Sequence, residues 1–375
     1  MAHFLPLRWV IELPDNDIAD LERDPVTKAR FVHEYIHYVQ CLTGTIGRHI
    51  LVEIARVSIF AGLHKAYGWP PPKNYGQIDL ADVLGRAEKV DFIGTEPAAQ
   101  YQEFDRELRF ALAAHMTRYN GAVASSSPFV STSHQVGQFK VDDFVHVVSQ
   151  HPTAGSMLIP VTDRVVFENM ARQVQKNFLR FNNDLDTTAV DDHRLGPSAD
   201  LPYVCLHDHL RARLAEGEDP AKWTITLCQI ALLCRNPGTA MRQMWQHLRD
   251  QDNCDLDAFT KVVGRDDWFK GEFNHPPLQK TLDELIGGLG TAMRMTENWE
   301  LREFTKCIAT ASNTLVDRYD YFADPLLEWK TVASWVSRFG CPPVICRDGR
   351  CTEIMGAKTS MPWHDYFTLA DRLLS

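Results

Sequence analysis

The chain has 375 residues, of which 45% are hydrophobic and 23% are charged; this balance is typical of a globular protein and excludes a disordered, collagen-like or coiled-coil chain. Its 49 acidic residues outnumber the 39 basic ones, the formal net charge is −10, and no dense block of Lys and Arg occurs. A role in binding nucleic acid is therefore disfavoured, because such binding needs concentrated positive charge.

The sequence favours a cytoplasmic protein. No stretch reaches the roughly 18–20 uninterrupted apolar residues of a membrane span. The first residues, MAHFLPLRWVIELPDN, lack the basic region, long apolar core and cleavage site of a signal peptide. Nine cysteines, an odd number, fit a reducing compartment better than a disulfide framework. We expect neither a membrane nor a nucleic acid among the partners.

Helical periodicity predicts a mainly α fold with a small β component. The first helix is expected at 25–42, with Asp24 as its N-cap and Pro25 at its first position. Further helices are expected, in chain order, at 50–61, 98–119, 163–181, 201–214, 223–234, 238–249, 278–295 and 299–321. Between the helices, 121–162 is predicted to be loop with at least two strands, including 144–148 and 157–161.

The last cysteines, Cys341, Cys346 and Cys351, are evenly spaced, which raises the alternative of a structural zinc site. The pair Asp348-Gly349 instead predicts a hairpin with a type I′ turn. That turn would set Cys346 opposite Cys351. A fourth ligand is not evident nearby, so we favour the hairpin.

The helix expected at 25–42 carries His33-Glu34-Tyr35-Ile36-His37, an HExxH sequence. Residues four apart return to nearly the same face of a helix, so both imidazoles can bind one metal ion. Glu34 lies about 100° around the helix from His33, where its carboxylate would touch a metal-bound water. Gln40 falls on the same face as the histidines. The alternative is a helix that carries two histidines by chance.

A catalytic zinc site needs a third protein ligand and an open position. The HExxHxxGxxH extension is absent, because Gln40 and Thr43 occupy the places of its Gly and third His. A carboxylate from a second helix is therefore expected. Glu168 is the best candidate, because an acid on a largely apolar helix would be costly to bury unpaired. The alternative for Glu168 is a surface salt bridge with Arg164 or Arg172.

These two segments resemble a known family. The run from His33 to Gln40, HEYIHYVQ, looks like the HEYxHxxQ helix of bacterial gluzincin-type, zincin-like metallopeptidases, and Glu168-Asn169-Met170-Ala171 is similar to the E-x-x-A helix that recurs downstream in such families. The resemblance implies a zincin-like core, with one Zn²⁺ per chain bound by His33, His37 and Glu168 and with Glu34 as the general base. One position departs from the pattern: thermolysin-like gluzincins have an Asp four residues after the ligand Glu, where this chain has Arg172.

The predicted function is a zinc-dependent metallopeptidase that hydrolyses a peptide or protein substrate. Glu34 would accept a proton from the metal-bound water and pass it to the leaving amine. The developing oxyanion needs a further donor, for which Tyr203, His207 and His209 are candidates. A metal site on His207 and His209 is disfavoured, because residues two apart on a helix point in different directions.

The polar stretch 191–197 is the best candidate for a domain boundary. We expect a zincin-like catalytic region at 1–190 and a helical C-terminal region at 191–375, packed against it. Two alternatives to the peptidase stay open. Two histidines and one carboxylate also form the ligand set of non-haem iron oxygenases, and a catalytically inactive zincin could serve as a binding or scaffold protein.

Overall fold

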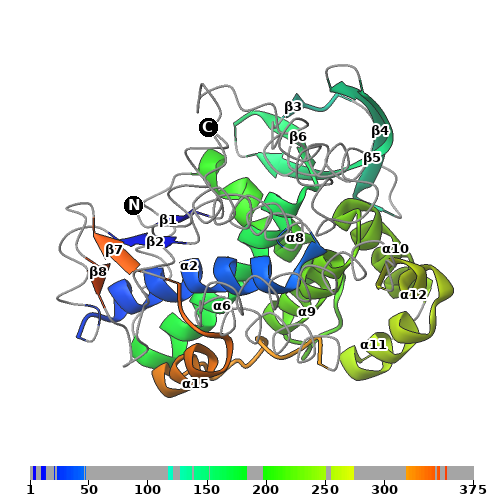
Figure 1. Cartoon of the computed structure of the whole chain (residues 1–375). Helices are drawn as coiled ribbons and strands as arrows, with labels where there is room; N and C mark the ends of the chain where they lie inside the picture. Colours follow the sequence, from blue (N-terminus) through cyan, green and yellow to red (C-terminus); the bar gives the residue numbers. More distant parts are fainter. Residues whose placement is uncertain are drawn as a thin grey trace, which may run out of the picture.

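In the part of the chain that the structure describes, the secondary structure is mostly helical, with two small β-sheets (Figure 1). The computed structural model describes residues 3–5, 10–13, 21, 23–45, 47, 117–120, 127–136, 139–151, 153–183, 197–250, 255–273, 318–342, 344–346 and 351–352. Its helices are α2 (Pro25–Thr43), α6 (Asp163–Asn183), α8 (Pro197–Arg213), α9 (Pro220–Leu233), α10 (Pro237–Asp250), α11 (Leu256–Arg265), α12 (Asp267–Phe273) and α15 (Trp329–Phe339). The expected mainly α fold with a small β component is confirmed.

One sheet contains β3 (Thr117–Arg118), β6 (Gly155–Pro160), β5 (Phe139–His151) and β4 (Phe129–Val136), in that order and all antiparallel. Its β5 packs on α8 and α10. The second sheet has the order β1 (His3–Leu5), β2 (Val10–Leu13), β7 (Val344–Cys346) and β8 (Cys351–Thr352). In it β2 and β7 run parallel, so the two ends of the described chain share one sheet.

Helix α2 begins as the sequence predicts. The Asp24 carboxylate accepts hydrogen bonds from the amides of Val26 and Thr27, at 3.4 and 2.9 Å, and Pro25 occupies the first helical position. The cap satisfies amides that have no partner inside the helix. The helix ends at Thr43, one residue beyond the prediction.

Helix α6 lies at the centre of the helical layer and packs against α2, α8 and α9. It starts three residues after β6 ends, and the Thr162 hydroxyl accepts a hydrogen bond from the Val165 amide at 3.4 Å. Val166, Met170 and Val174 are buried, as the predicted apolar stripe requires. The short connection from β6 fixes where α6 begins, and therefore where its polar side chains meet the neighbouring helices.

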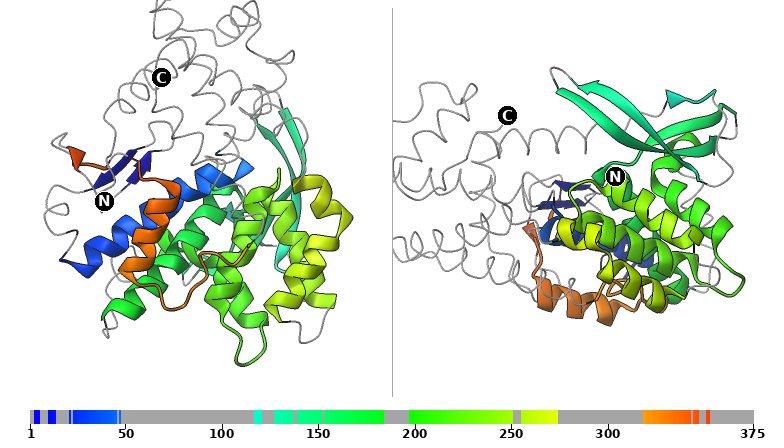
Figure 2. Two further views of the ribbon diagram at one scale, coloured as in Figure 1. Left: turned by 60° about the horizontal axis from the view of Figure 1, so that its bottom comes forward. Right: turned by 90° about the vertical axis from the view of Figure 1, so that its right-hand side faces the viewer.

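The C-terminal segment, residues 318–342, forms hydrogen bonds with α2. The hydroxyl of Tyr35 donates a hydrogen bond to the Gly340 carbonyl at 2.9 Å, and that of Tyr38 donates to the Phe339 carbonyl at 2.8 Å. Figure 2 shows α15 beside α2, where Trp329 lies edge-on to Phe31. One hydrophobic core includes residues from both sides of the expected boundary at 190. The division into two regions stays a prediction, but the described elements on either side of the boundary are packed together.

Several sequence-based predictions need correction. Thr117 and Arg118 form β3, paired with Leu158 and Met157 of β6, and not the end of a helix at 98–119; strand pairing overrides the local helical pattern there. Residues 319–322 form turns and not the end of a helix at 299–321, because Phe322 folds back onto Trp335. The strands β7 and β8 do form a hairpin, but Ile345 lies opposite Cys351. The pairing of Cys346 with Cys351 is therefore wrong by one residue.

The predicted helices at 50–61 and 278–295 lie outside the described residues, as do residues 191–196 of the expected boundary. No helix in the described part of the chain is long and apolar enough to cross a membrane.

Candidate metal centre

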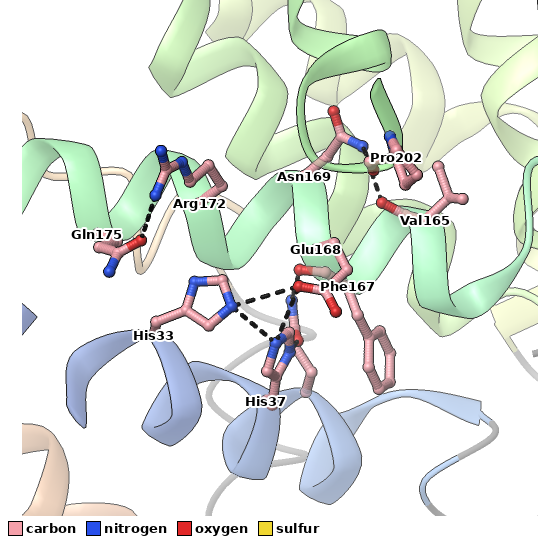
Figure 3. Close-up of polar contacts among 10 residues, drawn as sticks. His33, His37, Val165, Phe167, Glu168, Asn169, Arg172, Gln175 and Pro202 are labelled. Carbon is pink, nitrogen blue, oxygen red and sulfur yellow. Dashed lines mark hydrogen bonds and ion pairs between the residues drawn. The ribbon is translucent and has the colours of Figure 1, made fainter. Parts of the chain in front are cut away.

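The two histidines of the HExxH sequence face Glu168 across the contact between α2 and α6 (Figure 3). His33 Nε2 and His37 Nε2 lie 3.1 Å apart, and each lies 3.3 Å from Glu168 Oε2. Among the described residues, these three side chains form the one group of His, Cys, Asp and Glu whose ligand atoms converge closely enough to hold a metal ion. The structure thus brings together the three ligands that the sequence predicts.

The spacing of the three atoms fits a tetrahedral zinc ion. With zinc–ligand bonds of about 2.0–2.1 Å and tetrahedral angles, two ligand atoms lie about 3.3–3.4 Å apart. The observed separations of 3.1, 3.3 and 3.3 Å agree with that value. The three side chains are 11%, 12% and 15% exposed, so the cluster is largely enclosed and still reaches solvent.

The hydrogen bonding of the cluster is incomplete. Glu168 Oε2 and His33 Nδ1 are buried without a hydrogen-bond partner among the described residues; the two imidazole nitrogens lie 3.3 Å from Oε2 and form ion pairs with it when they are protonated. Buried polar atoms without partners are uncommon, because each costs free energy. A metal ion bound by Glu168 Oε2 would remove that cost.

The charges of the cluster are strongly coupled. Burial lowers the pKa of His37, but the Glu168 carboxylate, the charge of Glu34 and the hydrogen bond to Gln40 together outweigh burial and raise the pKa to about 9. Burial raises the pKa of Glu168, yet the two imidazoles hold it well below its usual range. The enclosed carboxylate therefore needs positive charge beside it, which either a protonated His37 or a bound cation supplies.

Gln40 orients His37. The amide of Gln40 donates a hydrogen bond to the Phe167 carbonyl at 3.1 Å, so its Oε1 faces His37 Nδ1 at 2.8 Å. Because Oε1 can only accept, Nδ1 carries the proton, and the Nε2 of a neutral His37 presents its lone pair to the cluster. Metal-binding histidines usually have such a partner on the other nitrogen. Sequence reasoning placed Gln40 on the correct face but did not assign it this role.

Arg172 does not replace the Asp of thermolysin-like gluzincins. Its Nη1 donates a hydrogen bond to Gln175 Oε1 at 3.0 Å on the same helix (Figure 3). The position that orients a ligand histidine in those gluzincins is used here for a contact along α6. Gln40 of α2 supplies the orientation instead.

Glu34 and Tyr203 border the cluster. The Glu34 side chain is buried, and its charge acts on both His37 and Tyr203. The Tyr203 ring, from α8, lies 6.4 Å from the His33 ring. Burial, followed by the charge of Glu168, raises the pKa of Tyr203 to about 12. The phenol is therefore protonated at neutral pH and can donate a hydrogen bond.

His207 and His209 are engaged elsewhere. His207 Nδ1 lies 3.0 Å from the Thr224 hydroxyl of α9, and His209 Nε2 lies 2.6 Å from the Val148 carbonyl of β5. Burial lowers the pKa of His207 to about 4, so its imidazole is neutral at pH 7. Of the three oxyanion donors suggested by the sequence, Tyr203 is the one in ring contact with a histidine of the cluster.

Comparisons with known proteins add no identification. No protein-family model matches the chain, and neither the curated proteins nor the solved structures give a match. The functional interpretation therefore rests on the residues of the cluster and their geometry.

Proposed function

We propose that this protein is a zinc-dependent metallopeptidase with a zincin-like core, which hydrolyses peptide bonds in a peptide or protein substrate. The observation that carries the proposal is the convergence of His33, His37 and Glu168, whose ligand atoms lie 3.1–3.3 Å apart, although Glu168 comes from a segment remote in sequence. Glu34, the residue that serves as general base in HExxH peptidases, borders the same cluster.

His33 Nε2, His37 Nε2 and Glu168 Oε2 would hold the ion. Zinc bound there supplies a Lewis acid for the scissile carbonyl and lowers the pKa of a bound water to about 7. Gln40 keeps the ligand nitrogen of His37 directed at the cluster.

The remaining chemistry belongs to Glu34 and Tyr203. Glu34 accepts a proton from the attacking water and then delivers it to the nitrogen of the leaving amine, which otherwise departs poorly. Tyr203 donates a hydrogen bond to the carbonyl oxygen as negative charge develops on it. Its elevated pKa of about 12 keeps the proton on the phenol through the neutral range.

The test combines metal content with one substitution. Protein purified without chelator or added metal is analysed by mass spectrometry and assayed against a mixture of fluorogenic peptides. We expect about one zinc per chain. Glu34→Gln is expected to lose hydrolysis by at least about 1000-fold while zinc stays bound. Glu216→Gln, the same change at an exposed position, is the control and should behave as the unaltered protein.

Other results would replace the proposal. Full hydrolysis by Glu34→Gln contradicts the assigned mechanism. Bound iron with oxygen consumption indicates an oxygenase that uses the same two histidines and carboxylate. Bound zinc without hydrolysis of any peptide, together with partner binding that survives Glu34→Gln, indicates an inactive zincin.

A further inference from the structure

Asn169, the residue after Glu168, is a fully buried amide that joins α6 to α8. Its Nδ2 donates hydrogen bonds to the Val165 carbonyl at 2.9 Å and to the Pro202 carbonyl at 2.7 Å. Its Oδ1 accepts from the amides of Leu206 and His207, at 3.1 and 3.4 Å. The side chain is 0% exposed. In Figure 3 Asn169 points toward Val165 and Pro202, on the side of α6 away from the metal-ligand cluster.

The position of these bonds on α8 is informative. The Pro202 carbonyl and the Leu206 amide are four residues apart, so they are the acceptor and donor that pair within one turn of a regular helix. The Asn169 amide bonds to both of them. Proline has no amide hydrogen, so the hydrogen bond that its nitrogen would make to the carbonyl four residues earlier is absent. The Asn169 side chain adds hydrogen bonds from the neighbouring helix to the turn that follows this proline.

Tyr203 lies inside the turn that Asn169 holds. The backbone groups that form hydrogen bonds with Asn169 belong to Pro202 and Leu206, on either side of Tyr203. The Tyr203 ring lies 6.4 Å from the His33 ring. Glu168 and Asn169 are consecutive on one helix, so the Glu168 carboxylate and the Asn169 amide move together. A rotation or slide of α8 relative to α6 would displace Tyr203 from the cluster and would break the hydrogen bonds of Asn169.

We propose that Asn169 is a positioning residue, which holds the Pro202–Leu206 turn of α8 so that Tyr203 lies beside the His33–His37–Glu168 cluster. The effect of Asn169 on catalysis rests on the proposed function, whereas the placement of Tyr203 beside the cluster does not. Both halves of the amide are needed, because the turn offers a carbonyl to a donor and two amides to an acceptor. Serine is too short to bond to all these groups, and aspartate has no hydrogen to give to the carbonyls.

The placement can be measured in the full chain labelled with 3-fluorotyrosine. The fluorine resonance of Tyr203 is assigned by its loss in Tyr203→Phe. Removing the neighbouring ring with His33→Ala should shift the Tyr203 resonance in the unaltered background, and should shift it much less when Asn169→Ser is also present. The matched control is Asn177→Ser: Asn177 is also a buried amide on α6, and it donates to the Asp324 carbonyl at 3.3 Å. With Asn177→Ser the effect of His33→Ala should persist.

Cobalt added to the same samples gives a second distance. Paramagnetic broadening by Co²⁺ falls with the sixth power of distance, so a displacement of Tyr203 away from the cluster should weaken the broadening of its resonance. Asn169→Ser should show this loss, whereas Asn177→Ser should not. Asn169→Asp, which keeps the acceptor and loses the donor, is a second variant should Asn169→Ser fold poorly.

The outcomes separate the two proposals. An unchanged Tyr203 resonance and unchanged broadening in folded Asn169→Ser and Asn169→Asp would overturn the positioning role, as would equal changes in Asn177→Ser. Failure of Co²⁺ to bind would refute the metal centre, and the metal-free shift would still decide the role of Asn169. If hydrolysis is found, Asn169→Ser should lower kcat with Tyr203 present and have less than about a twofold effect in Tyr203→Phe, because the two changes then act through one side chain. Additive losses would contradict the proposal.

Discussion

Glu168 and Asn169 are neighbours in the chain, yet their side chains enter two buried contacts of opposite character (Figure 3). Toward α2, the charged Glu168 lies 3.3 Å from His33 and His37, and its Oε2 has no hydrogen-bond partner among the described residues. Toward α8, the neutral Asn169 has partners for both halves of its amide. Buried polar groups normally complete their hydrogen bonds. The incomplete, charged contact is therefore the one suited to a ligand, and the complete, neutral contact is suited to fixing two helices.

Glu168→Gln should give the largest effect, because it removes the charge from the incomplete contact and keeps its volume. Losing one of three ligands of a zinc site should weaken Zn²⁺ binding by at least about 1000-fold, given total binding free energies of roughly 10–16 kcal/mol for structural zinc sites. Zinc affinity measured by competition with a chromophoric chelator would show it. Asp163→Asn, the same change at a buried acid at the start of α6, should leave zinc affinity within about threefold. Equal zinc affinity in Glu168→Gln and the unaltered protein would show that Glu168 is no ligand.

Asp163 also tests what a buried acid on α6 costs. Burial raises the pKa of Asp163 from 3.8 to about 7. The folded state thus keeps this proton when the unfolded state has lost it, so the stability contribution of Asp163 is complete below pH 3.8 and is lost as the pH rises to 7. Asp163→Asn should therefore raise the free energy of unfolding more at pH 8 than at pH 5, by about 2 kcal/mol once the favourable helix N-terminus is allowed for.

Urea unfolding of both proteins at pH 5 and pH 8 measures this difference. A stabilisation by Asp163→Asn that is the same at both pH values would show that the Asp163 carboxyl does not titrate in this range. Destabilisation at pH 8 would show that the carboxylate has a favourable partner.

Much of the candidate site could be predicted from sequence, because its signals are local. The HExxH spacing, the Asp24 cap and the Pro25 start all act within a few turns of one helix, and the structure has each of them. Glu168 could be chosen because it is an acid on a largely apolar helix. That argument required no knowledge of how α6 and α2 pack, only that a buried charge needs a partner.

The rest depends on pairing between distant segments. The contact of β2 with β7 joins residues more than 300 positions apart, and short strands carry little local signal. Helix α15 has a local helical pattern in Val332, Trp335, Val336 and Phe339, all buried, so this helix could have been predicted from the sequence. The role of Asn169 could not be predicted, because it depends on where Pro202 of another helix lies.

Gln40 tests the charged contact between α2 and α6 in a second way, because its removal leaves the side chains of His33, His37 and Glu168 in place. Gln40→Ala should weaken zinc binding by about 10–100-fold, the usual cost of losing the partner that orients a ligand histidine. Gln40→Glu keeps an acceptor for His37 Nδ1 and should recover most of the affinity. Gln175→Ala is the control: Gln175 is also a buried amide, but its Oε1 accepts from Arg172 and not from a ligand. A loss of affinity as large in Gln175→Ala as in Gln40→Ala would attribute both effects to general loosening.

The smallest effect is expected at the tyrosines of the same motif, which face the C-terminal segment and not the cluster. Tyr35→Phe and Tyr38→Phe each remove a hydrogen bond to a carbonyl at the end of α15, and each should lower the free energy of unfolding by about 1 kcal/mol. Zinc affinity should not change. Tyr321→Phe is the control, because the Tyr321 hydroxyl has no hydrogen-bond partner among the described residues.

The number of transitions in the unfolding curve tests whether the regions 1–190 and 191–375 unfold together. The two carbonyls belong to Gly340 and Phe339, on the far side of the expected boundary at 190 from the HExxH helix. If the shared core couples both sides, the unaltered protein unfolds in one transition, and both substitutions move that whole transition. The contrary result is two transitions, of which only the less stable one responds to Tyr35→Phe and Tyr38→Phe. The regions 1–190 and 191–375 would then unfold as separate domains, and the metal centre would not depend on the C-terminal segment.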